Sequence, residues 1–426
     1  MSLSPILFLG VFCCGIGAAV FISSEYAAYT YLLVFHMSPY GTWWESSVPA
    51  LRYLAIAGAV VVMASLTVKT RTGRDGWFSF RLAWWLTAFI VWLWVQLLWA
   101  KSSLSLEGAI LYTKHVVIAA ALYLLCKGRI PVVRNALLAI VLGGAWLGWL
   151  GQGRGGRVEG IAGAISDANT LGAHASACLL IASMLLFVAN RPSRAAAFLC
   201  IPFLLNNLIL SGSRGALLGL LAGGGAAFLL CPKTLKPKFI SLGALGFLLF
   251  LGLAHDRFIE RMVETYEAFV GGQQEKMDGS ASGRFVIAEA GLRMAFDYPE
   301  GVGYKGHAML SPFYLDRRFL TSGAAVGMEA GRSAHNSLIA VLVEFGFAGL
   351  FLFSGALLVA VAGVIRTGRS QMLPIELRVL NAGIGGVLGC VFIAGMFHNY
   401  SALEVMYWAM GLSCAVNAAE LPHAKK

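Results

Sequence analysis

The chain has 426 residues, of which 58% are hydrophobic and 12% charged, and its mean hydropathy is +0.74. Few soluble globular proteins have this balance, so the composition indicates a polytopic membrane protein. The net charge of +11 would suggest nucleic-acid binding in a soluble protein. Here basic cytoplasmic loops and an anion-binding surface explain it better, and we expect no nucleic-acid partner. All eight cysteines fall in apolar stretches, which predicts buried thiols and neither a disulfide framework nor a zinc site.

Twelve apolar runs along the chain approach the roughly 20 residues that a helix needs to cross a bilayer. The predicted spans lie near residues 5–22, 49–68, 83–100, 109–126, 132–150, 169–189, 195–211, 215–231, 239–255, 346–365, 379–398 and 402–419. The run 26–38 is too short to cross and rich in aromatic residues, and we expect it to lie at the interface or to re-enter the membrane. The sequence therefore predicts an all-α membrane protein with about twelve transmembrane helices.

Basic residues are unevenly divided between the two sets of connections. With the N-terminus in the cytoplasm, the inward connections and the tail carry seventeen Lys and Arg, whereas the short outward connections carry four. Since positively charged loops stay in the cytoplasm, this asymmetry predicts that both termini are cytoplasmic. It also places the long polar segment 256–335 on the outer side, which in a bacterium is the periplasmic face of the inner membrane.

The predicted spans divide the chain into three parts. Residues 1–255 hold the first nine spans, 256–335 form the periplasmic loop, and 336–426 hold the last three spans with a short tail. Within the loop, 256–270 and 283–299 carry apolar residues at helical spacing and predict two amphipathic helices over the membrane surface. The sequence shows no two six-span halves joined by a long cytoplasmic loop, which disfavours a transporter of that kind.

Four short stretches share the predicted outer face, and their side chains and backbone suit an anion. They are SGSRGAL (211–217), SASGRF (280–285), GVGYKGH (301–307) and RSAHN (332–336). The first supplies hydroxyls, free backbone N–H groups and a guanidinium, and the arginine of the second begins a helix, whose dipole also attracts phosphate. The alternative for the first arginine is a side chain that anchors a helix end by snorkelling. The predicted substrate-binding residues are Ser213, Arg214, Arg284, Tyr304, Arg332 and Asn336.

His335 is the candidate catalytic base. It lies where the periplasmic loop meets the tenth span, so water, lipid and loop all reach it. An ordinary imidazole pKa of ~6.5 suits proton abstraction near neutral pH, and nearby arginines would keep the ring neutral. The alternative is a structural histidine beside a helix N-cap. His307 and His398 are weaker candidates for the same role.

The sequence does not show the usual signature of a metal-dependent sugar transferase. No Asp is followed two positions later by Asp or Glu, and no Cys/His spacing typical of a metal site takes its place. We therefore expect a reaction without metal or other cofactor, in which arginines stabilise the charge of the leaving group.

Three stretches together resemble the O-antigen ligase and polymerase superfamily. They are SGSRGALLGLL, GRFVIAEAGLRMAFDYPEGVGYKGH and HNSLIAVLVEFGFAGLFLF, within residues 160 to 370. Matched motif by motif, the family's functional arginines correspond to Arg214 and Arg284 and its histidine to His335. The stretch SDANTLGAHAS also resembles a family segment, with Ala168 where proline is common and Asn169 in the family's asparagine position. Twelve spans and a long loop after the ninth are similar to the ligase branch, which resembles GT-C glycosyltransferases.

The resemblance implies transfer of an O-antigen glycan from undecaprenyl pyrophosphate to lipid A–core oligosaccharide. It also implies that the protein contacts membrane lipids and that the reaction needs no metal ion. We expect the protein to act as a monomer or weak oligomer. Polymerases of the same superfamily share the Arg and His features, so a polymerase remains an alternative. A flippase or transporter of lipid-linked sugars is the alternative from another functional class.

Overall fold

The computed structural model describes residues 3–72, 80–152, 158, 165, 167–254, 263, 279–316, 319–320 and 331–418. Over these residues the chain is helical and forms no strand, which confirms the predicted all-α fold. Eight of the described helices are long and apolar enough to cross a bilayer, and two shorter ones are also apolar. The protein is therefore a multi-pass membrane protein.

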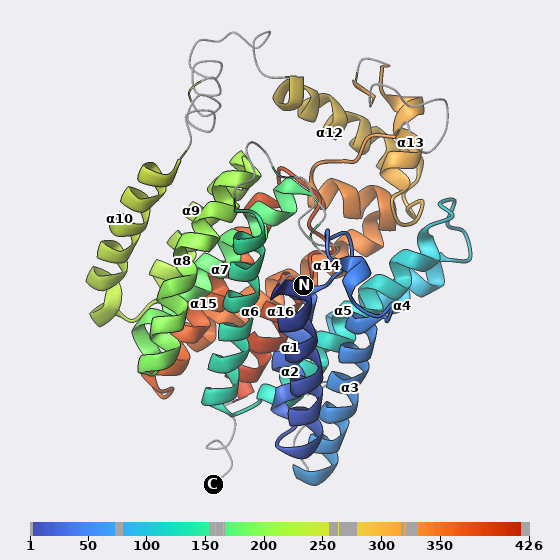
Figure 1. Cartoon of the computed structure of the whole chain (residues 1–426). Coiled ribbons are helices and arrows are strands. Elements are labelled where there is room, and N and C mark those ends of the chain that lie inside the picture. Colours follow the sequence, from blue (N-terminus) through green and yellow to red (C-terminus); the bar gives the residue numbers. More distant parts are fainter. Residues whose placement is uncertain are drawn as a thin grey trace.

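Each of the twelve predicted spans coincides with a helix in the structure (Figure 1). These helices are α1 (Leu3–Phe21), α3 (Tyr53–Thr72), α4 (Arg81–Gln96), α5 (Ser105–Cys126), α6 (Ile130–Leu150), α7 (Ala168–Val188), α8 (Arg191–Ser211), α9 (Arg214–Leu230), α10 (Lys236–Leu253), α14 (Ser337–Arg369), α15 (Ile375–Ala394) and α16 (Glu404–Asn417). The centre of the bundle is formed by α7, α9 and α15, and α16 packs against α5. Six cysteines are buried as predicted, whereas Cys13 and Cys14 are exposed on α1.

The short aromatic run forms an additional helix, α2 (Glu25–Met37). It packs against α1, α3 and α6, and most of its side chains are buried. The prediction was that this segment lies at the membrane interface or re-enters the membrane, and its burial among three other helices contradicts the interface position. Its aromatic residues are explained by packing inside the bundle, which sequence periodicity alone does not distinguish from packing at an interface.

Because α2 leads the chain back through the bundle, the start of α1 and the end of α16 lie at opposite ends of the bundle. Phe8, near the start of α1, meets Tyr53, which begins α3, edge to face, with ring centroids 4.8 Å apart. Glu25, at the start of α2, instead pairs with Arg129 of the basic α5–α6 connection at 3.0 Å. The last residue of α16, Asn417, also lies at that basic end, beside Gly363 of α14. The start of α1 and the end of α16 thus lie at opposite ends of the bundle, which does not fit the expectation that both termini share one side, and the side of the membrane on which each lies stays a prediction.

Two helices of the long loop form a cap beyond one end of the bundle (Figure 1). They are α12 (Gly279–Asp297), which matches the second predicted amphipathic helix and ends before Pro299, and α13 (Gly306–Tyr314). Their apolar faces form a small core with the first turns of α14. The other predicted loop helix, 256–270, lies outside the described residues apart from Val263.

Helix α14 is broken at Gly346, and the loop before α13 pairs with the break. Gly346 has φ 71° and ψ −176°, a conformation that essentially only glycine adopts. A Cβ there would lie 2.5 Å from the carbonyl oxygen of Pro299. The predicted tenth span, 346–365, therefore covers only the part of α14 after this break.

Three carbonyls at the break receive hydrogen-bond donors from outside α14. The backbone N–H of Val302 donates to Val343 at 3.1 Å, and that of Gly303 donates to Glu344 at 2.8 Å. Glu344 also accepts from the Gln96 side chain of α4 at 2.8 Å. The indole of Trp92 donates to the third carbonyl, Phe345, at 2.8 Å. An unpaired carbonyl inside a membrane protein is costly, so these bonds fix the break to both α4 and the cap.

We expect Gly346→Ala to destabilise the protein strongly. Alanine disfavours this φ/ψ region and its Cβ overlaps Pro299, so the free energy of unfolding should fall by at least ~2 kcal/mol. Thermal unfolding of the purified chain in detergent measures the effect. Gly225→Ala on α9 is the control, since nothing lies within 4 Å of its Cβ. Equal unfolding temperatures for both variants would contradict the structural role of the break.

Candidate active site

Three helices begin at the end of the bundle that carries the cap. Each starts after a polar residue whose side chain accepts backbone N–H bonds of the first turn: Asp167 for α7, Ser213 for α9 and Asn336 for α14. The donor–acceptor distances are between 2.9 and 3.3 Å. Such N-termini carry partial positive charge and favour a bound anion.

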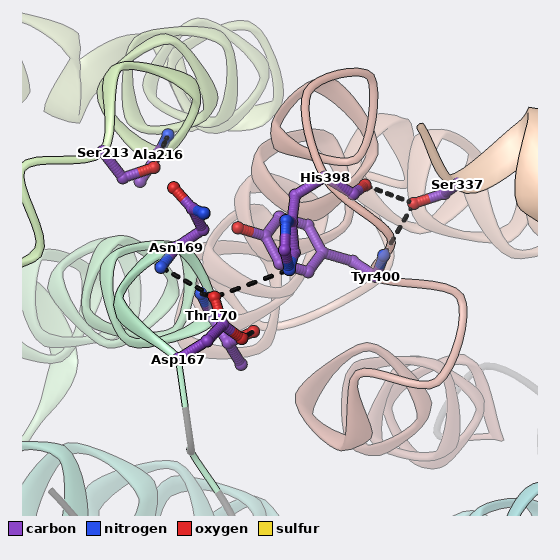
Figure 2. Close-up of polar contacts among 8 residues, drawn as sticks. All are labelled: Asp167, Asn169, Thr170, Ser213, Ala216, Ser337, His398 and Tyr400. Atoms are coloured by element: carbon purple, nitrogen blue, oxygen red, sulfur yellow. Dashed lines mark hydrogen bonds and ion pairs between the residues drawn. The ribbon is translucent and has the colours of Figure 1, made fainter. Parts of the chain in front are cut away.

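The turn formed by residues 395–400 lies among these N-termini (Figure 2). The hydroxyl of Ser337, the first residue of α14, donates to the carbonyl of His398 at 3.1 Å. The same hydroxyl accepts from the backbone N–H of Tyr400 at 2.8 Å. The start of α14 is thereby locked to the turn that carries His398.

Arg214 begins α9 beside the same turn. The chain makes the predicted tight turn there, because Gly212 ends α8 in the left-handed conformation with φ 55°. The next residue of α9, Gly215, is packed so closely that a Cβ would lie 2.9 Å from the side chain of Phe397. The helix start that carries the predicted anion-binding arginine is therefore packed against the turn that contains Phe397 and His398.

His335 lies directly before the N-cap of α14. Its φ of 47° is in the left-handed region, which is uncommon for a residue other than glycine and is often found at functional sites. Its ring centroid is 5.6 Å from that of His398. Burial lowers the pKa of His335 to about 3, and the charges near it, His398 and then Arg332 and Arg284, act in the same direction. The structure thus brings together Arg284, the stretch that holds Arg332 and His335, and His398, which lie far apart in the sequence.

His398 has a carboxylate partner that sequence reasoning missed. Its Nε2 lies 3.5 Å from Oδ1 of Asp167, the N-cap of α7 (Figure 2). Burial raises the pKa of Asp167, but hydrogen bonds from His398 and Thr170 outweigh burial and hold it below its usual range. Asp167 therefore stays charged and orients the imidazole, an arrangement common where a histidine moves protons.

In the cap, His307 positions Arg332. Its Nδ1 donates to the carbonyl of Arg332 at 2.9 Å, and the backbone N–H of Arg332 donates to the hydroxyl of Ser311 at 2.7 Å. Burial lowers the pKa of His307, so this ring is neutral and its tautomer is fixed by the bond to Arg332. His307 therefore fixes the backbone of Arg332.

Four buried nitrogens in this region lack a hydrogen-bond partner among the described residues. They are Nε of Arg332, Nδ1 of His335, Nδ1 of His398 and Nε2 of His307. Buried polar atoms are nearly always paired, and exceptions call for an explanation such as a catalytic role. Their concentration beside three helix N-termini marks this end of the bundle as the candidate site.

Tyr304, predicted as a substrate contact, lines a cavity of about 610 Å³ next to this site. Burial and the charges of Glu344 and Glu107 raise the pKa of Tyr304 to about 12, so its hydroxyl is protonated at neutral pH. Thr170, Asn399 and Tyr400 also line the cavity and follow closely after Asp167 and His398 in the chain. The cavity and the histidine cluster therefore share a wall.

One group of possible metal ligands lies elsewhere, among the described residues of α2 and α7. Atoms of His36, His174 and Cys178 lie within 4.8 Å of one another. His36 donates through Nδ1 to the Leu32 carbonyl at 2.5 Å, and its Nε2 is 2.6 Å from Nε2 of His174. Two ligands on one tetrahedral zinc ion lie about 3.3 Å apart, so this pair as it stands is hydrogen-bonded. His36 and His174 are 138 positions apart in the chain, so no motif spacing in the sequence revealed this group.

Comparison with known proteins agrees with the motif resemblance. Residues 195–354 match the family model described as O-antigen ligase. The exopolysaccharide production protein ExoQ of Rhizobium meliloti (strain 1021) is 25% identical over 320 residues, which cover 71% of this chain and 70% of that protein. The matched region runs from α8 to α14 and contains Arg214, Arg284 and His335. These similarities indicate a membrane protein of polysaccharide biosynthesis of the ligase or polymerase type.

Proposed function

We propose that this chain, which belongs to the O-antigen ligase family over residues 195–354, is a lipid-linked glycan transferase. It moves a glycan from undecaprenyl pyrophosphate to a sugar hydroxyl of lipid A–core oligosaccharide at the periplasmic face of the inner membrane. The observation that carries the proposal is the convergence of Arg332 and Arg284 with His335 and His398, beside the turn against which the first residues of α9 pack. This arrangement suits one anion and one proton transfer at the same place.

The pyrophosphate of the donor binds where the arginines meet the helix N-termini. Arginine supplies a planar fork of donors that matches phosphate oxygens, and α9 and α14 add partial positive charge. As the glycosidic bond breaks, negative charge grows on the leaving pyrophosphate. Groups already oriented toward that charge lower the barrier without reorganising, which makes a metal ion unnecessary.

His335 accepts the proton of the attacking hydroxyl. The hydroxyl oxygen forms the new bond to the anomeric carbon while the proton passes to the imidazole, and the bonding electrons of the old linkage leave with the pyrophosphate. Attack from the face opposite the leaving group inverts the anomeric configuration. His398, held by Asp167, lies beside His335, and the negative charge of Asp167 favours the imidazolium that forms.

A polymerase is the second candidate, favoured by the relative named for exopolysaccharide production. Its chemistry is the same, but the attacking hydroxyl belongs to another lipid-linked glycan. The basic connections at the opposite end of the bundle support the periplasmic placement in both cases.

Reconstitution into liposomes tests the function. The purified chain is supplied with an undecaprenyl-pyrophosphate-linked oligosaccharide, with or without lipid A–core, in excess EDTA. We expect glycan on the core and release of undecaprenyl pyrophosphate. A lengthened donor would instead identify the polymerase. Movement of the donor across the bilayer without transfer, and equal in His335→Ala, would identify a transporter.

The arginines should be needed for turnover more than for folding. Arg214→Ala and Arg284→Ala should each lose roughly a hundredfold in rate, or about 3 kcal/mol of transition-state stabilisation. Arg214→Lys and Arg284→Lys keep the charge but lose the two-pronged donor geometry, so they should be clearly impaired as well. Single-turnover rates with saturating donor measure this effect. Arg194→Lys is a control at the basic end of the bundle, where the side chain caps the Ala189 carbonyl. Near-normal turnover in both alanine variants would place the pyrophosphate elsewhere.

The pH profile should identify His335 as the base. Because its pKa is lowered in the free protein, the acid limb of kcat/KM for the donor should lie well below pH 6.5. In kcat the limb should lie higher, since bound pyrophosphate compensates the arginine charges.

His335→Asn removes the imidazole while tolerating the left-handed conformation, so it should fold normally. It should lose roughly 10²–10⁴ in rate together with the acid limb. A variant that keeps both the rate and the limb would transfer the assignment to His398.

A further inference from the structure

The cavity beside the histidine cluster has a different chemical character from the anion site. Its charged lining side chains are two carboxylates, Glu107 and Glu404, and one ammonium, Lys114. The Nζ of Lys114 lies 3.6 Å from Glu404 and is therefore largely neutralised. A cavity with this balance repels a pyrophosphate, which the arginines on the other side of the shared wall would bind.

Glu404 is a fixed polar anchor in the wall of this cavity. Glu404 is 4% exposed, and its carboxylate accepts a hydrogen bond from the hydroxyl of Tyr31. The Nε2 atom of His115 lies 3.6 Å from the same carboxylate. His115 is itself 2% exposed and lines the cavity, and its Nδ1 has no hydrogen-bond partner among the described residues. A buried, unpaired ring nitrogen beside a held carboxylate is an arrangement that a hydroxyl-rich ligand can satisfy.

The remaining walls are aromatic with polar edges. Tyr40, Tyr304 and Tyr400 present rings together with hydroxyl groups, and Phe35 adds an apolar face. Flat rings stack on the C–H faces of pyranose sugars, while carboxylate and tyrosine oxygens bind vicinal hydroxyls. The volume of about 610 Å³ lies within the range of about 300–1,000 Å³ typical of small-molecule sites.

We infer that this cavity is the acceptor subsite and binds the terminal neutral sugars of the acceptor glycan. The inference rests on the proposed transfer function and identifies which part of the structure selects the acceptor. The cavity wall includes Thr170, Asn399 and Tyr400. These residues follow Asp167 or His398 in the chain by one to three positions, so the bound sugar lies close to both. Tyr400 lies beside His398, with ring centroids 5.0 Å apart (Figure 2). A hydroxyl of the sugar therefore reaches the histidine cluster past Tyr400, while the donor pyrophosphate stays on the arginine side.

Filling the cavity tests this assignment without altering the arginines, His335 or His398. Leu111→Trp extends a ring from α5 into the cavity, and Ala402→Phe does so from another wall. The matched control is Ile110→Trp, the neighbouring position on α5, whose side chain is 53% exposed on the outside of the bundle. All variants are assayed as full-length protein in liposomes with the acceptor that gives product with the unaltered chain.

We expect Leu111→Trp and Ala402→Phe to raise KM for the acceptor at least tenfold, with KM for the donor and the unfolding temperature unchanged. Ile110→Trp should leave all three unchanged. Glu107→Gln removes one charged hydrogen-bond acceptor without filling space and should raise KM for the acceptor about tenfold. An increased donor KM with unchanged acceptor KM would assign the cavity to the donor and overturn the inference. Unchanged constants in all cavity variants would overturn it as well.

The test separates this inference from the proposed function. Failure of the unaltered chain to transfer any glycan would refute the function itself. Transfer that proceeds normally in every cavity variant refutes only the acceptor subsite. Where a tryptophan variant does not fold, Glu107→Gln alone decides, because its side chain is exposed at the cavity and the substitution changes no volume.

Discussion

The break in α14 is the constraint on which the rest of the structure depends. A helix that crosses a membrane normally satisfies its own backbone, and interrupting it leaves carbonyls that lipid cannot pair. Here Val302, Gly303, Gln96 and Trp92 supply the missing donors, so the break exists only when α4 and the loop segment 299–303 are both in place. The interruption therefore joins the cap to the bundle through directional bonds at a defined depth.

This junction explains how residues far apart in the chain come to share one site. The first half of α14 packs with α12 and α13 in a core of its own, which brings Arg284, His307 and Arg332 to the cap. Its N-terminus is bound through Ser337 to the turn that carries His398. His335 lies between these two attachments and has a left-handed backbone. Its position is thus determined by the packing on both sides, which is the condition under which a strained residue persists.

Sequence reasoning found what depends on local pattern and missed what depends on tertiary contact. The spans follow from runs of apolar residues, and the turn at Ser213 follows from capping and glycine signals. The helix of Arg284 was also predicted, but α12 begins at Gly279, so Arg284 lies in its second turn and not at its N-terminus as expected. The passage formed by α2 was missed because thirteen residues fall short of a bilayer when read alone, although packing against α1, α3 and α6 buries them. Asp167 precedes α7 as an ordinary N-cap, and nothing in its neighbourhood reveals that it meets His398 more than two hundred positions later. Glu404 was missed in the same way, since its partners come from α2 and α5.

The charges around the site are separated in a way that suits two substrates with opposite requirements. Helix N-termini and arginines gather on the side of the cap, and carboxylates with tyrosines line the cavity between α5 and α16. His335 and His398 lie at the boundary, near positive charge on one side and next to Asp167 on the other. In the proposed reaction, the arginines favour the neutral imidazole before proton transfer, and Asp167 and the departing pyrophosphate favour the imidazolium afterwards. The same arrangement of fixed charges therefore promotes both the uptake of the proton and its retention while the product leaves, which a single uniformly charged pocket could not do.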